Sequence, residues 1–167
     1  IINLSFAAGD GLGVAALSLV GQSLGEKRPD MAIIYGKTGQ LMAFCVSTVL
    51  FFVFIFARHF LVSLFTNDAS VIAMGGVIMI IIAFTTHIQT AQVVYSGCLR
   101  GSGDTKFVAL SSFVSIGIIR PLLSWVLCFP CGLGLVGAWL GLFGDQTMRL
   151  LFCMTRFCGG KWTKIEV

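Results

Sequence analysis

The chain alternates between long apolar stretches and short polar ones. Each apolar stretch is close to the roughly 20 residues that an α-helix needs to cross the hydrocarbon core of a bilayer. Most charged residues lie in the polar stretches, and glycine or proline marks several boundaries. The pattern predicts an all-α membrane protein, a bundle of about five transmembrane helices. The expected spans are residues 1–24, 39–57, 71–97, 107–128 and 134–155, followed by a basic tail at 156–167.

The composition supports a place in the bilayer. Hydrophobic residues make up 57% and charged residues 11% of the chain, and the mean hydropathy is +0.97, far from the balance of a soluble domain. The net charge is +4, but the basic residues are spread over several loops, so nucleic acid is not an expected partner. The chain begins without Met inside an apolar run and shows no signal peptide. We therefore expect further residues before Ile1.

The distribution of Lys and Arg predicts an orientation. The loop at 25–37 and the tail carry three each, the loop at 98–106 carries two, and the remaining loops carry one and none. Cytoplasmic loops are enriched in Lys and Arg. We therefore expect these two loops and the C-terminus on the cytoplasmic side, and the start of the first span outside.

The cysteines and histidines indicate no catalytic or metal chemistry. The six cysteines lie mostly within or at the ends of apolar spans and form no disulfide framework. Cys128 and Cys131 have the spacing of half a metal site, but no second ligand pair exists. His59 and His87 lie on different elements without an H-E-x-x-H motif. We expect neither a metal site nor an organic cofactor, and we do not expect the protein to be an enzyme.

Ionisable residues inside the spans are the first candidates for function, because they are costly in lipid and usually face a cavity or a partner. Asp10, His87, Arg120 and Asp145 fall roughly at mid-membrane, where a shared depth allows a shared network. Arg149 lies four residues after Asp145 and can pair with it along the helix. Alternatively, Asp145 or Asp10 exchanges a proton or Na⁺, with Arg120 holding a carboxylate charged. His87 is either a packed, hydrogen-bonded side chain or part of a proton-linked switch.

The third span carries a polar stripe. Its members are Thr85, Gln89, Gln92 and Ser96, spaced by 4, 3 and 4 residues, which places them on one narrow helix face. This face either lines water or substrate, or it joins helices by hydrogen bonds. The fifth span has a second pattern, with glycines at 134, 137, 141 and 144. These predict a small-residue seam for close helix contact.

A polar, glycine-rich hinge separates the third and fourth spans. Its glycines at 97, 101 and 103 are expected to allow positive φ angles where the backbone turns. Asp104 and Thr105 are expected to cap the following helix. Pro121, within the fourth span, predicts a kink that a surrounding bundle tolerates.

The hinge also resembles a known signature. Residues 99–106 read LRGSGDTK, similar to the L-R-G-x-G-D-T-[KR] motif of the multidrug and toxic compound extrusion (MATE) family of efflux transporters. Three further stretches match that family in order: LVGQSLG at 19–25, IRPL at 119–122 and GLVGAW at 134–139. The motif residues that match are Gly21, Gln22, Leu99, Arg100, Gly101, Gly103, Asp104 and Thr105.

The resemblance implies a function. It makes the chain helices 8–12 of a twelve-helix fold in the cell membrane, lacking the N-terminal lobe of the same transporter. That transporter would export small amphipathic or cationic compounds in exchange for H⁺ or Na⁺ by alternating access. A lipid-linked saccharide flippase of a related fold and an inactive fragment are the alternatives. Many members, as we align them, have Pro near the position of His87, so this helix is expected to be straighter than theirs.

Overall fold

The computed structural model describes residues 2–64, 69–130, 132–160 and 162. Within these ranges the chain forms helices and turns, with no strand. The elements are α1 (Ile2–Gly25), α2 (Pro29–Phe56), α3 (Arg58–Ser63), α4 (Ala69–Gly101), α5 (Thr105–Val114), the π-helical η1 (Ser115–Ile119), α6 (Arg120–Cys128) and α7 (Gly134–Cys158).

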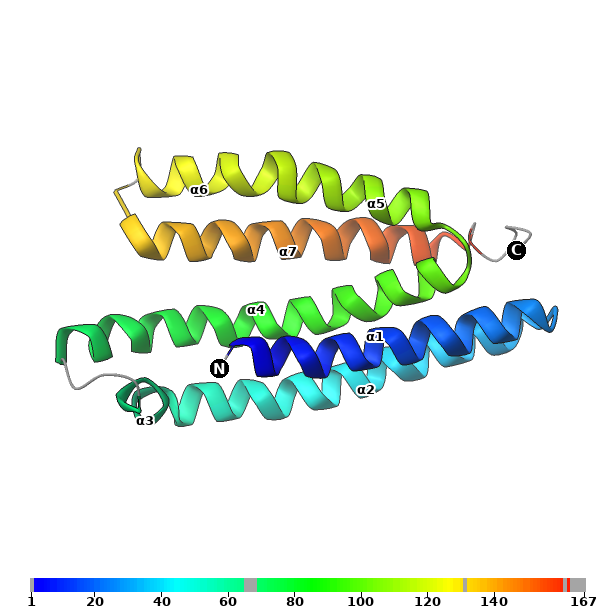
Figure 1. Ribbon diagram of the computed structural model, residues 1–167, viewed down its shortest axis with the longest axis horizontal. Helices are drawn as coiled ribbons and strands as arrows, with labels where there is room; N and C mark the ends of the chain where they lie inside the picture. Colours follow the sequence, from blue (N-terminus) through cyan, green and yellow to red (C-terminus); the bar gives the residue numbers. More distant parts are fainter. Residues whose placement is uncertain (1, 65–68, 131, 161, 163–167) are drawn as a thin grey trace.

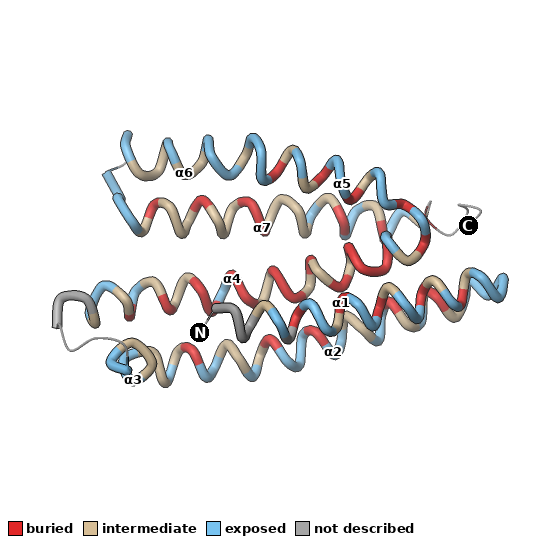
Figure 2. Tube along the Cα trace, in the orientation of Figure 1, coloured by how far each residue is buried: buried red, intermediate tan, exposed pale blue. Residues whose placement is uncertain are grey.

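The helices lie roughly along one axis, with α4 at the centre (Figure 1). Helices α1 and α2 pack on one side of α4 and α7 packs on the other, while α6 packs against α7. Buried residues concentrate along the second half of α4 (Figure 2). The α1–α2 loop, the α4–α5 loop and the end of α7 lie at one end of the molecule, and α3 and the α6–α7 turn lie at the other (Figure 1).

Three helical segments are long and apolar enough to cross a membrane: Pro29–Phe56, Ile72–Gly101 and Thr105–Cys128. The second of the expected spans begins earlier than the sequence pattern indicated, because residues 29–37 are the first turns of α2 and not a loop. Pro29 has a φ angle already suited to a first helical turn, and the acidic Asp30 favours a helix N-terminus. The loop shrinks to residues 26–28.

The fourth expected span is one continuous rod of α5, η1 and α6. Its π-helical part, Ser115–Ile119, ends just before Pro121. Proline lacks an N–H and its ring crowds the carbonyl group four residues earlier, here that of Gly117. A widened π turn accommodates that crowding. The irregularity expected from Pro121 is therefore a π turn.

The glycines of the hinge do not act as predicted. Helix α4 continues to Gly101, and only Gly103 of the three has a positive φ, at +82°. A Cβ atom on Gly97 would collide with the carbonyl oxygen of Gly13, and one on Gly101 would collide with that of Leu17. Two of the three glycines therefore let the backbones of α1 and α4 approach closely.

The predicted small-residue seam on α7 is confirmed at three of its four positions. Cβ atoms on Gly137, Gly141 and Gly144 would run into residues 123–128 of α6. Gly134 has no atom within 4 Å of its would-be Cβ and a φ of +51°. It starts the helix and takes no part in the seam.

Candidate functional site

The polar stripe of α4 is buried. Thr85, Gln89, Gln92 and Ser96 are between 2% and 9% exposed. The Thr85 hydroxyl donates to the carbonyl of Ile81 at 2.7 Å, and Ser96 Oγ accepts from Arg100 Nη2 at 2.8 Å. Gln89 Oε1 has no hydrogen-bond partner. The stripe therefore retains unused hydrogen-bonding capacity, which is costly in an apolar interior.

A second set of polar groups lies on α7. Asp145 is 1% exposed, and its Oδ1 atom has no hydrogen-bond partner. Gln146 Oε1 and Arg149 Nε are likewise buried without partners. Arg149 and, from α6, Arg120 interact electrostatically with the Asp145 carboxyl group. Three polar side chains between positions 145 and 149 of α7 are thus left incompletely satisfied.

The predicted ion pair between Asp145 and Arg149 is not formed. Across the described ranges, the single ion pair within 4.0 Å joins Arg156 to Asp104. A spacing of four residues brings two side chains to the same helix face. Formation of the ion pair also depends on the side-chain rotamers and on Arg120, which competes with Arg149 for the carboxyl group. The carboxyl group is instead placed near two guanidinium groups without a direct contact to either.

The α7 set lies at the height of the first part of the α4 stripe. Helices α4 and α7 run in the same direction (Figure 1) and pack together, with the Cys153 thiol beside the Gln92 side chain. Both helices rise by about 1.5 Å per residue. Asp145, two turns before Cys153, therefore lies near the level of Thr85. We use the name buried polar cluster for the buried polar groups of these two helices, Gln89, Gln92, Asp145, Gln146 and Arg149, in which Gln92 lies about two turns further along the axis than Asp145.

The four ionisable candidates do not form one network. Asp10 is exposed and lines a separate cavity of about 200 Å³ between α1 and α4, which Arg100 also lines. His87 is engaged with α2, where its Nδ1 lies 2.8 Å from Ser47 Oγ. Asp145 and Arg120 interact with each other. The expected common depth of these residues stays a prediction, and the helix faces on which they lie separate them into three groups.

The motif residues join the ends of helices. The Asp104 side chain makes no capping hydrogen bond to α5, contrary to the prediction. Its Oδ2 atom accepts a hydrogen bond from Arg156 Nε of α7 at 2.7 Å, and the Arg156 guanidinium group lies 5.1 Å from the Phe107 ring centroid. Gly21 allows a close approach to the Gly101 carbonyl. The motif thus ties α1, α4, α5 and α7 together at one end of the molecule.

Sequence reasoning did not single out every polar member of the site. Gln146 is buried beside Asp145, and Ser115 is fully buried in η1 with an unpartnered hydroxyl. Gln146 carried a usable signal, because an amide inside an apolar span next to a carboxyl group is unusual. Ser115 carried none, since an isolated serine in a span commonly bonds to its own helix.

Apolar helices with ionisable and amide groups buried between them define a polytopic membrane protein with a functional interior. The MatE family model matches residues 1–126, so the chain belongs to the MatE family of transporters.

Comparisons with individual proteins agree with that family. The chain is 31% identical to the "Probable multidrug resistance protein NorM" of Thermotoga maritima, over 99% of this chain and 36% of that protein. It is 28% identical to "Protein DETOXIFICATION 49" of Arabidopsis thaliana, over 93% of this chain and 31% of that protein. The crystal structure of the eukaryotic MATE transporter AtDTX14 matches 98% of this chain and 36% of its own, with a TM-score of 0.91 at 18% identity. The chain spans about a third of the length of these proteins.

Proposed function

We propose that the chain supplies five helices of the C-terminal lobe of a secondary antiporter that exports small amphipathic or cationic compounds. Family membership and relatives named for multidrug resistance and toxin extrusion support this proposal. The share of each relative that is matched, about a third, fits a chain that works together with an N-terminal lobe.

The observation that carries the proposal is the buried, incompletely satisfied Asp145 carboxyl group next to Arg149 and Arg120. A nearby positive charge stabilises a buried carboxylate. Binding of a proton or Na⁺ to the carboxylate weakens its electrostatic attraction to that charge. When the cation binds, the carboxyl group no longer attracts the two nearby guanidinium groups. Packing of α7 against α6 and α4 then shifts, which biases the transporter toward one of its two conformations.

The polar stripe supplies the substrate-facing groups in this proposal. Amide and hydroxyl side chains of Gln89, Gln92 and Ser96 can bond to ligand polar groups, while the surrounding span offers apolar contacts. A site with few fixed polar groups is permissive, as broad specificity requires. Two lobes rocking about a central cavity would expose this face to either side of the membrane in turn.

The test is transport by the full transporter in sealed proteoliposomes. Ethidium uptake or release is followed by fluorescence under an imposed pH gradient and, separately, an imposed Na⁺ gradient. We expect one gradient to drive ethidium against its concentration, and Asp145→Asn to abolish the coupling. Gradient-independent equilibration of ethidium would contradict the proposal. The matched control is the 167-residue chain reconstituted without the N-terminal lobe, which we expect to move no dye.

A further inference from the structure

A small polar cavity lies between the end of α1 and the start of α2. It encloses about 80 Å³, and its walls include Leu19, Gln22, Glu26, Arg28, Met31 and Tyr35. All six belong to one helical hairpin, formed by the two helices and the short loop between them. Sites for drug-sized ligands are larger, at roughly 300–1,000 Å³. This cavity is therefore suited to a small polar group.

The α1–α2 loop holds two charged residues of the cavity in a defined turn. The Arg28 N–H donates to the Ser23 carbonyl at 2.9 Å, and the Lys27 N–H donates to the Leu24 carbonyl at 2.9 Å. These two bonds close the end of α1 as a Schellman motif. Lys27 has a φ angle of +57°, at the position of that motif where glycine is usual. Glu26 and Arg28 are thus fixed on either side of a tight turn.

Glu26 and Arg28 line the same cavity without forming an ion pair with each other. In the described part of the chain, the single ion pair within 4.0 Å joins Arg156 to Asp104, so neither residue has a charged partner there. A carboxylate and a guanidinium group held apart in one cavity match a ligand that carries both charges, because each charge of the ligand meets its opposite. The cavity is complementary to a zwitterion.

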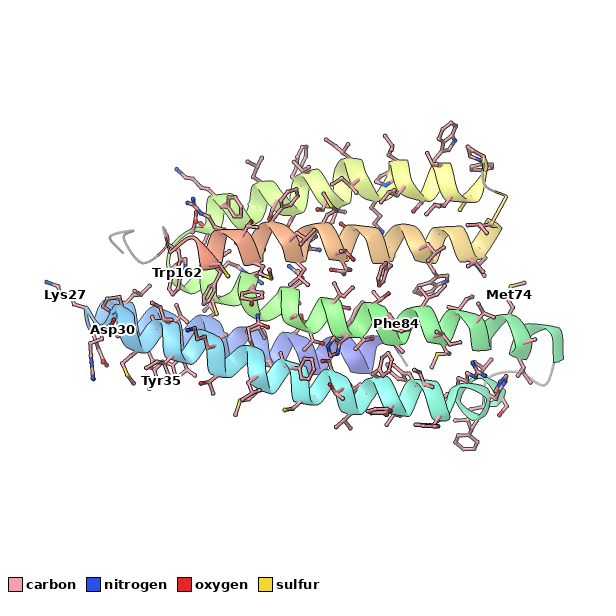
Figure 3. The ribbon with its side chains drawn as sticks, turned by 180° about the vertical axis from the view of Figure 1, so that it is seen from behind. Lys27, Asp30, Tyr35, Met74, Phe84 and Trp162 are labelled. Atoms are coloured by element: carbon pink, nitrogen blue, oxygen red, sulfur yellow. The ribbon has the colours of Figure 1, made fainter. Side chains whose placement is uncertain are left out.

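The cavity lies where lipid headgroups are expected. It is at the end of the molecule that carries the α1–α2 loop, where Lys27, Asp30 and Tyr35 are labelled in Figure 3. Tyr35 comes about one helical turn before residue 39, the expected start of the apolar stretch of α2. Tyrosine is enriched at membrane–water interfaces. The cavity is therefore at the edge of the hydrocarbon core and not within it.

The lining changes from charged to apolar along the cavity. Helices α1 and α2 run in opposite directions (Figure 1), and a Cβ atom on Gly39 would lie 3.9 Å from the Ala16 Cβ atom. Counting from that contact places Leu19 close to the level of Tyr35, nearer to the apolar stretch than the charged residues of the loop are. Leu19 is 41% exposed, so an acyl chain can contact it. A phospholipid has the same order, with a charged headgroup followed by apolar chains.

We propose that this cavity binds the headgroup of phosphatidylethanolamine, with Arg28 on the phosphate and Glu26 on the ammonium group. Guanidinium–phosphate and ammonium–carboxylate contacts are charge-assisted hydrogen bonds. Phosphatidylcholine has the same phosphate, but its trimethylammonium group has no N–H to donate to Glu26. The site is separate from the buried polar cluster, and lipid binding here does not depend on coupled transport.

The test compares the two lipids, with identical acyl chains, on the full-length transporter in detergent by native mass spectrometry. We expect the Kd for phosphatidylethanolamine to be about threefold lower than that for phosphatidylcholine, the size of one exposed charged contact. Glu26→Gln should raise only the Kd for phosphatidylethanolamine and so remove the difference. Arg28→Gln should raise both Kd values about threefold and leave their ratio unchanged, because both lipids carry the phosphate.

The matched control is Asp30→Asn, an exposed carboxyl group two residues after Arg28 that does not line the cavity. It should change neither Kd, and unfolding midpoints check that each variant is folded. Equal Kd values for the two lipids in the parent protein would overturn the proposal, as would an unchanged ratio in Glu26→Gln. Water-soluble glycerophosphoethanolamine should compete poorly. If it binds as tightly as the lipid, the cavity takes a free zwitterion and the assignment to a lipid is wrong.

Discussion

At the scale of single residues, the cost of burying polar groups separates Asp145 from the other candidates. A buried carboxyl group without a full set of partners is costly, and the guanidinium groups of Arg149 and Arg120 near Asp145 lower that cost. Asp10 avoids this cost because it is exposed, and His87 avoids it through its hydrogen bond to Ser47. Among these candidates, Asp145 is therefore the residue whose ionisation has the largest electrostatic effect on the helices packed around it.

We predict that Asp145→Asn lowers the initial rate of gradient-driven ethidium transport at least about tenfold, the equivalent of about 1.4 kcal/mol, and more than His87→Ala does. The amide keeps the size of the side chain but removes the negative charge near Arg149 and Arg120. Rates are measured in proteoliposomes at matched protein content. The control is Asp30→Asn, an exposed position in the first turn of α2. Equal rates for Asp145→Asn and the parent protein would remove this carboxyl group from the mechanism.

The polar stripe followed from the sequence, and the reason is periodicity. A polar residue every third or fourth position of an apolar span can only form one face, so the polar stripe was predictable and is buried as a set. The partners across the interface were not predictable. Whether Asp145 reaches Arg149 depends on rotamers and on η1 and α6, elements that no local spacing describes.

At the scale of elements, close backbone contact holds α1 to α4. In lipid, helix association depends on packing rather than on release of water, so small residues at the contact matter. Gly97 and Gly101 of α4 face Gly13 and Leu17 of α1. The sequence suggested that these two glycines lie in a turn, because they are close to Gly103, which does lie in the turn between α4 and α5. The sequence alone could not separate the two uses, since glycine serves both.

We predict that Gly97→Ala destabilises the protein by about 1–3 kcal/mol, the usual cost of overpacking. The added methyl group meets the backbone carbonyl of Gly13, which cannot move aside as a flexible side chain can. The matched control is Gly11→Ala on α1, where no atom lies within 4 Å of the would-be Cβ. Alanine there is expected to be neutral or stabilising by up to about 1 kcal/mol. Thermal unfolding in detergent compares the two, and equal midpoints would contradict close α1–α4 packing.

The Asp104–Arg156 ion pair connects two other elements, the start of α5 and the end of α7. Asp104 is 9% and Arg156 29% exposed at the side chain, so the pair is partly screened, and we expect about 1 kcal/mol from it. Asp104→Asn or Arg156→Gln should lower the unfolding midpoint. The swapped double variant, Asp104→Arg with Arg156→Asp, should recover part of the loss. Identical midpoints for all variants would show that the pair contributes nothing to stability.

At the scale of the whole molecule, the arrangement of helices places the basic segments together. The α1–α2 loop with Lys27, the α4–α5 loop and Trp162 near the end of the chain lie at one end, and Met74 near the start of α4 lies at the other (Figures 1 and 3). Trp162 is packed there, stacked on Phe157 at a centroid distance of 4.9 Å and donating its indole N–H to the Phe157 carbonyl at 2.8 Å. Trp162, fixed to the bundle in this way, lies at the same end of the molecule as both basic loops.

We predict that this end is cytoplasmic, because loops with many Lys and Arg residues are retained on the cytoplasmic side. Green fluorescent protein fused after Val167 should fluoresce in bacterial cells, and alkaline phosphatase fused at the same point should be inactive. Fusions after Ser63, at the end of α3, should give the reverse pattern. Changing Lys27, Arg28 and Lys37 together to Gln removes three of the charges that set the orientation, so it should produce a mixed population with activity in both reporters at each site. Active phosphatase at Val167 in the unchanged protein would show the opposite topology. It would also reverse the side of the membrane from which substrate and coupling ion reach the buried polar cluster.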